Sequence, residues 1–279
     1  MLTKKITLLL FICAAFFASC SNENAETADK TADKMADFAE DENFKDQHEK
    51  PAPVEFKAMG EMTTFDTPDG KTASAYLLKS KEPSDKYLFV FQEWWGLNDN
   101  TKREADKYFA ALENVNVLAP DMYDGKSTDN PDEAGKLMKG TDPERLENII
   151  KGALNYAGEE PEVATIGWCF GGGLSLKASI LAGESGKGCV MYYGMPVKTA
   201  AELAPLEVPV LGIFAEKDQW INREVIGEFE KLAAATGKTV NNYWFEADHA
   251  FANPSQERYV EEEATKANAM AMEFIKKRL

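Results

Sequence analysis

The sequence predicts an α/β fold with a mainly parallel sheet and helices on both faces. Apolar, β-branched runs alternate with amphipathic segments along residues 53–279, and such alternation is typical of strands joined through crossover helices. A glycine-rich stretch, Gly167 to Gly173, directly follows one of these runs. Sites in parallel sheets lie beyond the carboxyl ends of the strands, so the residues at those ends are the candidates for function.

The elements are placed from their hydrophobic period and their turn residues. The turn Thr67-Pro68-Asp69-Gly70 predicts an opening hairpin between residues 54–65 and 73–78. Further strands are expected at 87–91, 115–119, 161–166, 189–193, 208–214 and 239–245, and helices at 100–113, 143–157, 174–181, 222–235 and 255–279.

Cys169 occupies the centre of the stretch Gly167-Trp168-Cys169-Phe170-Gly171. Small residues two positions before and two positions after a central residue, between a strand and a helix, are typical of a nucleophile elbow. At the start of a helix a cysteine is favoured as thiolate. The alternative is that the turn is only a packing solution and Cys169 a buried core residue.

The N-terminal residues 1–19 are predicted to be a signal peptide, because a basic start is followed by a short apolar run. The run ends in Ala18-Ser19-Cys20, which resembles a bacterial lipobox. We therefore expect Cys20 to be the lipidated first residue of a protein anchored in the bacterial cell envelope. An ordinary secretory signal is the alternative.

Residues 20–52 are rich in Asp, Glu, Lys, Ala and Thr. Such a composition is typical of a disordered linker, and on this basis His48 is a solvated histidine. The catalytic domain is then expected over residues 53–279, with His249 as its single histidine.

Three candidate catalytic residues follow predicted strands in the order Cys169, Asp218, His249. This order of nucleophile, acid and histidine is that of α/β-hydrolases. Histidine is the usual general base near neutral pH. Asp248 is a second candidate for orienting the imidazole, but a direct neighbour of His249 reaches Nδ1 with difficulty, so Asp218 is preferred.

The segments Gln92 to Asn98, Ala119 to Tyr123, Gly167 to Gly172 and His249 to Phe251, together with Asp218, resemble the dienelactone hydrolase family. The resemblance implies an α/β-hydrolase fold and an ester or lactone hydrolase with a Cys-His-Asp triad. It also implies an oxyanion hole made by the backbone N–H groups of Trp94 and Phe170, and a catalytic Glu93 that contacts the resting thiol.

The sequence departs from that family where its members carry substrate-binding arginines. Asn253 stands four residues after the histidine, and no arginine precedes Arg145 in the region after Tyr123. Aromatic residues are the expected substrate-binding side chains: Trp95, Tyr123, Trp220 and Phe251. An aromatic pocket without fixed cations suits a neutral ester or lactone, although core packing is the alternative role for these rings.

Composition excludes several other classes. The net charge of −16 argues against nucleic-acid binding. One histidine in the predicted catalytic domain, and no cluster with metal-ligand spacing, predict no metal and no cofactor. We expect a monomer. Two rival functions remain: a binding protein on the same fold without turnover, and a thiol redox protein that uses Cys169 with Cys189.

Overall fold

The structure is a computed structural model, and it describes residues 34–279. The predicted signal peptide and Cys20 lie outside the described residues. Among residues 34–279, no helix is both long and apolar enough to cross a membrane.

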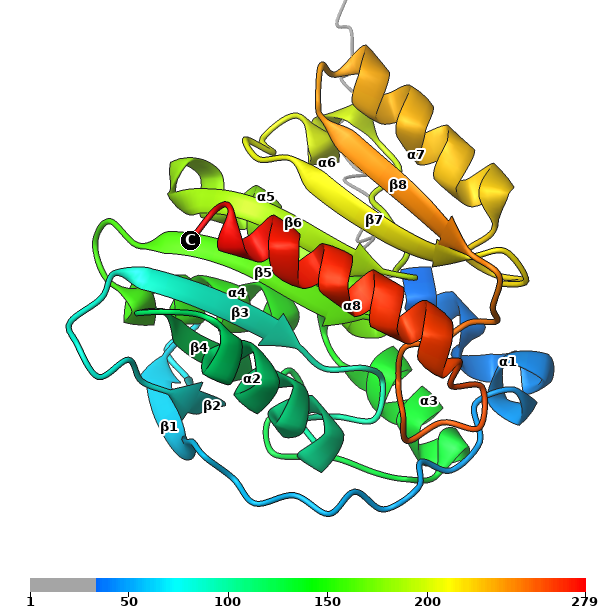
Figure 1. Cartoon of the computed structure of the whole chain (residues 1–279), viewed down its shortest axis with the longest axis horizontal. Helices are drawn as coiled ribbons and strands as arrows, with labels where there is room; N and C mark the ends of the chain where they lie inside the picture. Colours follow the sequence, from blue (N-terminus) through cyan, green and yellow to red (C-terminus); the bar gives the residue numbers. More distant parts are fainter. Residues whose placement is uncertain (1–33) are drawn as a thin grey trace, which may run out of the picture. The chain divides into compact units, whose positions relative to one another are not determined.

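An eight-stranded sheet forms the centre of the fold, with strand order β1-β2-β4-β3-β5-β6-β7-β8. β1 pairs with β2 and β2 with β4 in antiparallel fashion, and every later pairing is parallel. Figure 1 shows the central strands with their carboxyl ends toward one edge of the molecule. The strands are β1 (Glu61–Asp66), β2 (Thr72–Leu78), β3 (Lys86–Phe91), β4 (Asn116–Pro120), β5 (Glu162–Trp168), β6 (Gly186–Tyr192), β7 (Val210–Ala215) and β8 (Val240–Phe245).

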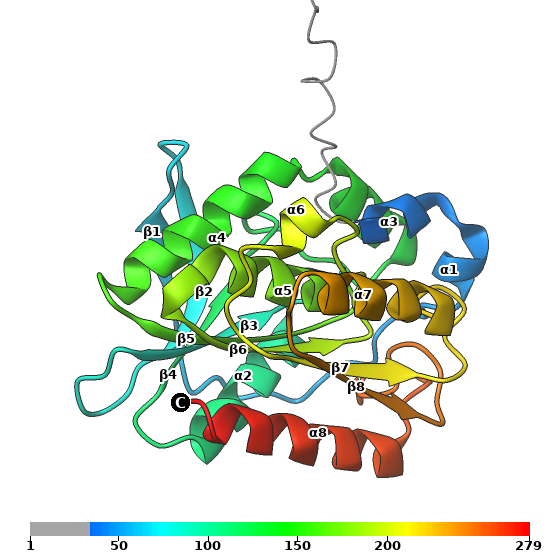
Figure 2. The same ribbon diagram turned by 90° about the horizontal axis from the view of Figure 1, so that it is seen from above.

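Helices cover both faces of this sheet, as Figure 2 shows: α2 and α8 lie on one face, and α4, α5 and α7 on the other. The inner strands are therefore buried on both sides and consist of continuous apolar residues, as in β7, where every residue is buried. The helices are α1 (Glu42–Asp46), α2 (Asp99–Ala111), α3 (Pro131–Gly140), α4 (Pro143–Ala157), α5 (Phe170–Ala182), α6 (Ala200–Leu203), α7 (Arg223–Ala235) and α8 (Glu261–Lys276), with 3₁₀ segments η1 (Lys34–Glu40) and η2 (Gly183–Ser185).

The predicted α/β fold is confirmed, and most predicted elements are found within a few residues of their expected bounds. α4 begins at Pro143 and ends at Ala157, as predicted. The last helix begins at Glu261 rather than at residue 255, because residues 255–258 form turns instead: Ser255 donates to Asn253 Oδ1, and the backbone N–H of Gln256 donates to the backbone oxygen of Asn253. α3 was not predicted from the sequence, although Asn130 caps it and Pro131 occupies its first turn.

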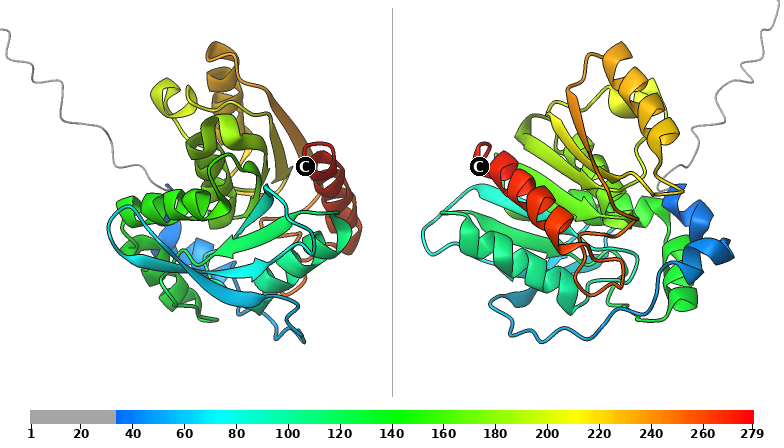
Figure 3. Two further views of the ribbon diagram at one scale, coloured as in Figure 1. Left: turned by 90° about the vertical axis from the view of Figure 1, so that its left-hand side faces the viewer. Right: turned by 45° about the vertical axis from the view of Figure 1, so that its right-hand side comes forward.

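The prediction of a disordered linker is wrong for its described part. Residues 34–50, which we call the N-terminal cover, contain η1 and α1. Met35 and Phe44 are fully buried and Ala39 is 4% exposed. Figure 3 shows this segment beside α3. Spaced apolar residues within a charged sequence bury enough surface to order the segment, at about 1.5–3 kcal/mol for a side chain such as Phe44.

Polar contacts also hold the N-terminal cover. Asp41 caps α1 by accepting from the backbone N–H groups of Asn43 and Phe44. The Asn43 side chain donates to Gln219 Oε1 over 3.1 Å, and the indole N–H of Trp220 donates to Asp41 Oδ2 over 3.4 Å.

A second set of contacts joins the N-terminal cover to α3. Lys45 pairs with Asp132, and Lys139 pairs with Glu40. A side chain at Gly135 would lie 2.8 Å from Ala39 O, so the backbones approach each other closely and only glycine fits there.

Candidate active site

Cys169 lies at the turn between β5 and α5, where the elbow was predicted. Its backbone has φ 54° and ψ −120°, a strained conformation for a residue with a side chain. A Cβ on Gly167 would collide with the backbone of Gly171, and a Cβ on Gly171 would collide with the carbonyl oxygens of Phe91 and Gln92. The two glycines therefore allow strand and helix to approach, and Cys169 lies in the tight turn directly after the last residue of β5.

His249 and Asp218 lie on the loops that follow β8 and β7, at the same edge of the sheet. His249 Nδ1 is 2.6 Å from Asp218 Oδ2, and both side chains are buried. Asp218 Oδ1 accepts from the backbone N–H groups of Trp220 and Ile221. His249 holds the pKa of Asp218 below its ordinary value, against the effect of burial. A charged carboxylate at Oδ2 accepts the Nδ1 proton, so the lone pair of His249 is on Nε2.

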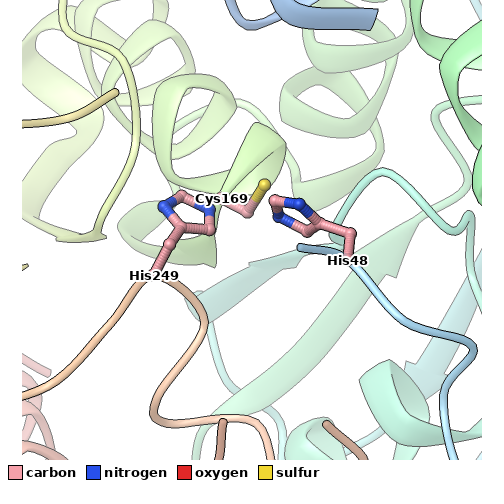
Figure 4. Close-up of side chains that lie close together, drawn as sticks. All are labelled: His48, Cys169 and His249. Atoms are coloured by element: carbon pink, nitrogen blue, oxygen red, sulfur yellow. The ribbon is translucent and has the colours of Figure 1, made fainter. Parts of the chain in front are cut away.

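His48 lies in the same site, and its prediction as a solvated histidine is wrong. It is 2% exposed, and its ring centroid lies 5.1 Å from that of His249. Its Nδ1 lies 2.6 Å from the backbone oxygen of Phe44. Burial lowers the pKa of His48 to about 3, so the imidazole is neutral at neutral pH, with its lone pair on Nε2. Figure 4 shows His48, Cys169 and His249 close together.

Phe44 packs among the aromatic rings around this site. Its ring centroid lies 4.0 Å from that of His48, 5.1 Å from that of Trp94 and 5.0 Å from that of Trp220, and the two tryptophan contacts are edge-on. Cys169 and His249 are each only 1% exposed. The N-terminal cover therefore contributes to the enclosure of the nucleophile and histidine.

Phe170 and Trp94, whose backbone N–H groups are the expected oxyanion hole, lie at the ends of neighbouring strands. Phe170 is the first residue of α5, and its backbone N–H is one of the helix-start donors without an intrahelical acceptor. Trp94 follows β3 and packs edge-on against His48 and Trp95. Its backbone and that of Phe170 thus belong to the two strand ends that border Cys169.

Among the expected substrate-binding rings, Trp220 lies nearest the histidine, with ring centroids 6.3 Å apart. Tyr123 packs against the Phe170 ring at 5.5 Å. Phe251 packs instead between Phe245 and Tyr193. Trp95 is 1% exposed, and its described ring contact is with Trp94. Of these four, Trp220 is the ring that directly borders the histidine.

Glu93 follows β3 and is held by Asn253, not by an arginine. Asn253 Nδ2 donates to Glu93 Oε2 over 2.5 Å, and Asn253 Oδ1 accepts from the backbone and hydroxyl of Ser255. Burial raises the pKa of Glu93 to about 7, against the lowering effect of the Asn253 hydrogen bond. A neutral amide here leaves Glu93 close to half-protonated at neutral pH.

The titration of Glu93 predicts a specific pH dependence of stability. Because its pKa rises from 4.5 to about 7 on folding, the native state binds more protons between these values. The free energy of unfolding therefore falls as pH rises through this window, by about 3 kcal/mol in total, and levels off above pH 7. The Glu93→Gln variant has no such group and should not lose this stability. The free energy of unfolding of the variant, minus that of the wild type, should therefore be larger at pH 8.5 than at pH 5.

Urea denaturation at the two pH values measures this difference. Glu159→Gln is the matched control, because Glu159 is exposed. Equal effects of Glu93→Gln at both pH values would contradict the assigned titration.

Cys189 and Arg145 have contacts that are explained by the fold. Neither Cys169 nor Cys189 forms a disulfide among residues 34–279, and Cys189 lies in the core on β6, with its Sγ 3.5 Å from the Ser175 hydroxyl. Arg145 is 7% exposed, and its guanidinium pairs with Asp69 and Asp124.

The sequence did not indicate that Phe44 and His48 belong to this site, nor that Asn253 donates a hydrogen bond to Glu93. Phe38 and Phe44 are the aromatic residues of an otherwise charged segment. That signal was present in the sequence, but the high charge around it outweighed it. The Asn253 contact joins residues 160 positions apart and left no local pattern.

Comparisons with known proteins agree with this geometry. Residues 73–279 match the model of the dienelactone hydrolase family. The "Putative carboxymethylenebutenolidase" of Aquifex aeolicus is 31% identical over 231 residues, covering 78% of this chain and 98% of the relative. "Protein usf" of Aquifex pyrophilus is 31% identical over 211 residues, covering 71% and 90%.

Solved structures share the fold. A dienelactone hydrolase-like promiscuous phosphotriesterase from metagenomic libraries superposes with a TM-score of 0.68 at 18% identity, covering 78% of this chain and 98% of that chain. The dienelactone hydrolase of Anabaena variabilis superposes with a TM-score of 0.60 at 15% identity, covering 80% and 100%. The match to the family model extends over more than half of the chain, and the sheet order and elbow agree with an α/β-hydrolase. The chain therefore belongs to the dienelactone hydrolase family.

Proposed function

We propose that the chain cleaves small, neutral esters or lactones, with Cys169 as nucleophile, His249 as base and Asp218 as the residue that orients it. One observation carries the proposal. His249 is fixed by Asp218 at 2.6 Å, and an imidazole nitrogen of His249 lies within 4.8 Å of the Cys169 sulfur at the elbow. Nucleophile, base and orienting acid in this relation are the general arrangement of covalent acyl transfer.

The chemistry follows from the positions of the protons. His249 Nε2 takes the proton of the Cys169 thiol, and the sulfur adds to the substrate carbonyl. The developing oxyanion is stabilised by the backbone N–H groups of Phe170 and Trp94. The imidazolium then protonates the leaving oxygen. His249 next draws a proton from water, whose oxygen adds to the thioester carbonyl. The C–S bond then breaks, the acid is released, and the imidazolium returns its proton to the Cys169 sulfur. Asp218 stabilises the imidazolium in both steps.

The substrate class is inferred from the side chains that enclose Cys169. Phe44, Trp94 and Trp220 present apolar rings, and Asn253 gives Glu93 a neutral partner. A substrate carboxylate would face the buried Glu93 without a cation bonded to that residue, at a large desolvation cost. A neutral acyl group loses less on entering such a site. We therefore propose uncharged aryl esters and lactones.

A panel of uncharged and carboxylate-bearing esters and lactones tests the proposal. We expect turnover of the uncharged members and much weaker turnover of their carboxylate analogues. Asp218→Asn should reduce kcat by roughly 10²- to 10⁴-fold, since it loses orientation and tautomer control rather than the nucleophile. Asp248→Asn is the matched control and should stay near the wild-type rate. Equal losses in the two variants would contradict the role of Asp218.

A binding protein without turnover is the second candidate. The observation that favours it is the enclosure of Cys169, which is 1% exposed. Such a protein would bind uncharged esters saturably and leave every member of the panel intact.

We also propose that Cys20 is lipidated and anchors the protein in the bacterial cell envelope. Support comes from the lipobox-like Ala18-Ser19-Cys20 sequence. Mass spectrometry of the native N-terminal peptide should find Cys20 as the first residue, carrying lipid. An N-terminal peptide that starts elsewhere, or an unmodified Cys20, would contradict the proposal.

A further inference from the structure

His48, Cys169 and His249 place three metal-ligating atoms in one buried space. One ligand atom from each side chain lies within 4.8 Å of the other two, and all three residues are buried (Figure 4). Among residues 34–279, these three side chains are the group of His, Cys, Asp and Glu whose ligand atoms lie close enough together to hold a metal ion. The proposed hydrolysis needs Cys169 and His249, whereas His48 takes no part in it.

The hydrogen bonds on the outer sides of the two imidazoles fix their tautomers. His249 Nδ1 donates to Asp218, and His48 Nδ1 donates to the backbone oxygen of Phe44, each over 2.6 Å. A carboxylate or carbonyl partner on one ring nitrogen leaves a lone pair on the other, and this is how metal-binding histidines are held.

The inner nitrogens are buried and lack partners. His48 Nε2 and His249 Nε2 make no hydrogen bond within the described chain. Two lone pairs held close together in a buried space repel each other unless a positive group lies between them. The Cys169 thiol can supply one proton to one of them. A metal cation bound by both nitrogens and the sulfur satisfies all three atoms.

We propose that His48, Cys169 and His249 bind a divalent transition metal ion of the Zn²⁺ type. Two imidazoles and one thiolate are borderline-soft ligands that suit zinc, and three protein ligands leave a fourth position for water. Tetrahedral bonds of about 2.0–2.3 Å require the three atoms to approach by about 1 Å. His48 lies outside the sheet on the N-terminal cover and is the ligand placed to make this adjustment.

Metal binding exchanges one proton of the site for the metal ion. The Cys169 thiol loses its proton to solvent, its sulfur binds the metal, and the two Nδ1 protons stay on their oxygen partners. The metal then occupies the lone pair of His249 and the sulfur together. Metal binding therefore excludes hydrolysis by Cys169 and ties the N-terminal cover to the sheet.

Zn²⁺ titration of the full chain against a chromophoric chelator tests the site. We expect one Zn²⁺ to bind with release of about one proton, measured by calorimetry in two buffers of different ionisation enthalpy. Co²⁺ should give a thiolate charge-transfer absorption that is lost in Cys169→Ala. Both readouts are independent of the proposed hydrolase activity, so failure of one proposal is distinguishable from failure of the other.

His48→Ala and His48→Gln should each weaken Zn²⁺ binding by at least about 100-fold, the upper end of what even outer-shell changes cause. Glutamine keeps a polar side chain at this position but has no imidazole nitrogen. Cys189→Ala is the matched control and should leave the affinity unchanged. Wild-type affinity in His48→Gln, or an unchanged Co²⁺ absorption in Cys169→Ala, would overturn the proposal.

Discussion

Cys169→Ala and His249→Ala should each remove nearly all ester hydrolysis, by roughly 10⁴-fold or more in kcat. Cys169 is the proposed nucleophile, and the imidazole of His249 is both fixed by Asp218 and within reach of its sulfur. The double variant should be no slower than either single variant, because the two residues act as a unit. Steady-state kinetics on an uncharged aryl ester measures both effects.

Cys189→Ala is the matched thiol control for this experiment, since Cys189 is a free, buried cysteine in the core. It should keep the wild-type rate. Alkylation should stop turnover with modification at Cys169, located by peptide mass spectrometry. A Cys169→Ala variant with the wild-type rate would end the assignment of the nucleophile.

Phe44→Ala should release the N-terminal cover and open the active site. Phe44 is fully buried against Trp94, Trp220 and His48, and truncation of a buried phenylalanine costs about 3–5 kcal/mol. We expect this cost to act through local detachment of the N-terminal cover, which contains no strand of the sheet. We therefore expect faster proteolysis within residues 34–50 and faster alkylation of Cys169.

Asp46→Ala is the control for the Phe44 variant, since Asp46 is an exposed residue of the same helix. It should leave both rates at wild-type values. If Phe44→Ala alkylates Cys169 no faster than the wild type, the cover does not limit access to the nucleophile.

The fold could be predicted because each element has a local signal. Strands such as β7 are continuous apolar runs, and α4 begins with a proline after a capping aspartate and ends before a glycine. The elbow could also be predicted from a local signal, because its close backbone contacts require glycine at Gly167 and Gly171, which lie within five residues of sequence. The prediction of a disordered linker failed because it used the average polarity of the segment. The docking of Phe44 depends instead on one buried side chain and on Trp94 and Trp220, which lie far away in the sequence.

Some residues of the candidate site could likewise be predicted from the sequence, and others could not. Cys169, Asp218 and His249 could be proposed because each follows a strand of one parallel sheet, so topology alone brings them to one edge. His48 precedes the sheet and reaches the site through the packing of Phe44. No period or motif encodes that packing. Phe38 and Phe44 indicate that the segment is able to dock, but the rings that surround Phe44 come from residues far apart in the sequence, so the place where it docks, and with it the position of His48, could not be predicted.

The position of the N-terminal cover has a consequence for synthesis of the protein. The cover leaves the ribosome before any strand, yet the partners of Asp41 and Asn43 follow 179 and 176 residues later. At typical elongation rates this delay is roughly 10 to 40 s. During that time Phe44 has no native surface to bury it, and contacts of such large sequence separation form slowly. The nascent chain therefore carries an exposed aromatic segment that other proteins, including chaperones, are able to bind. The active site is enclosed only after β8 and the His249 loop have been made.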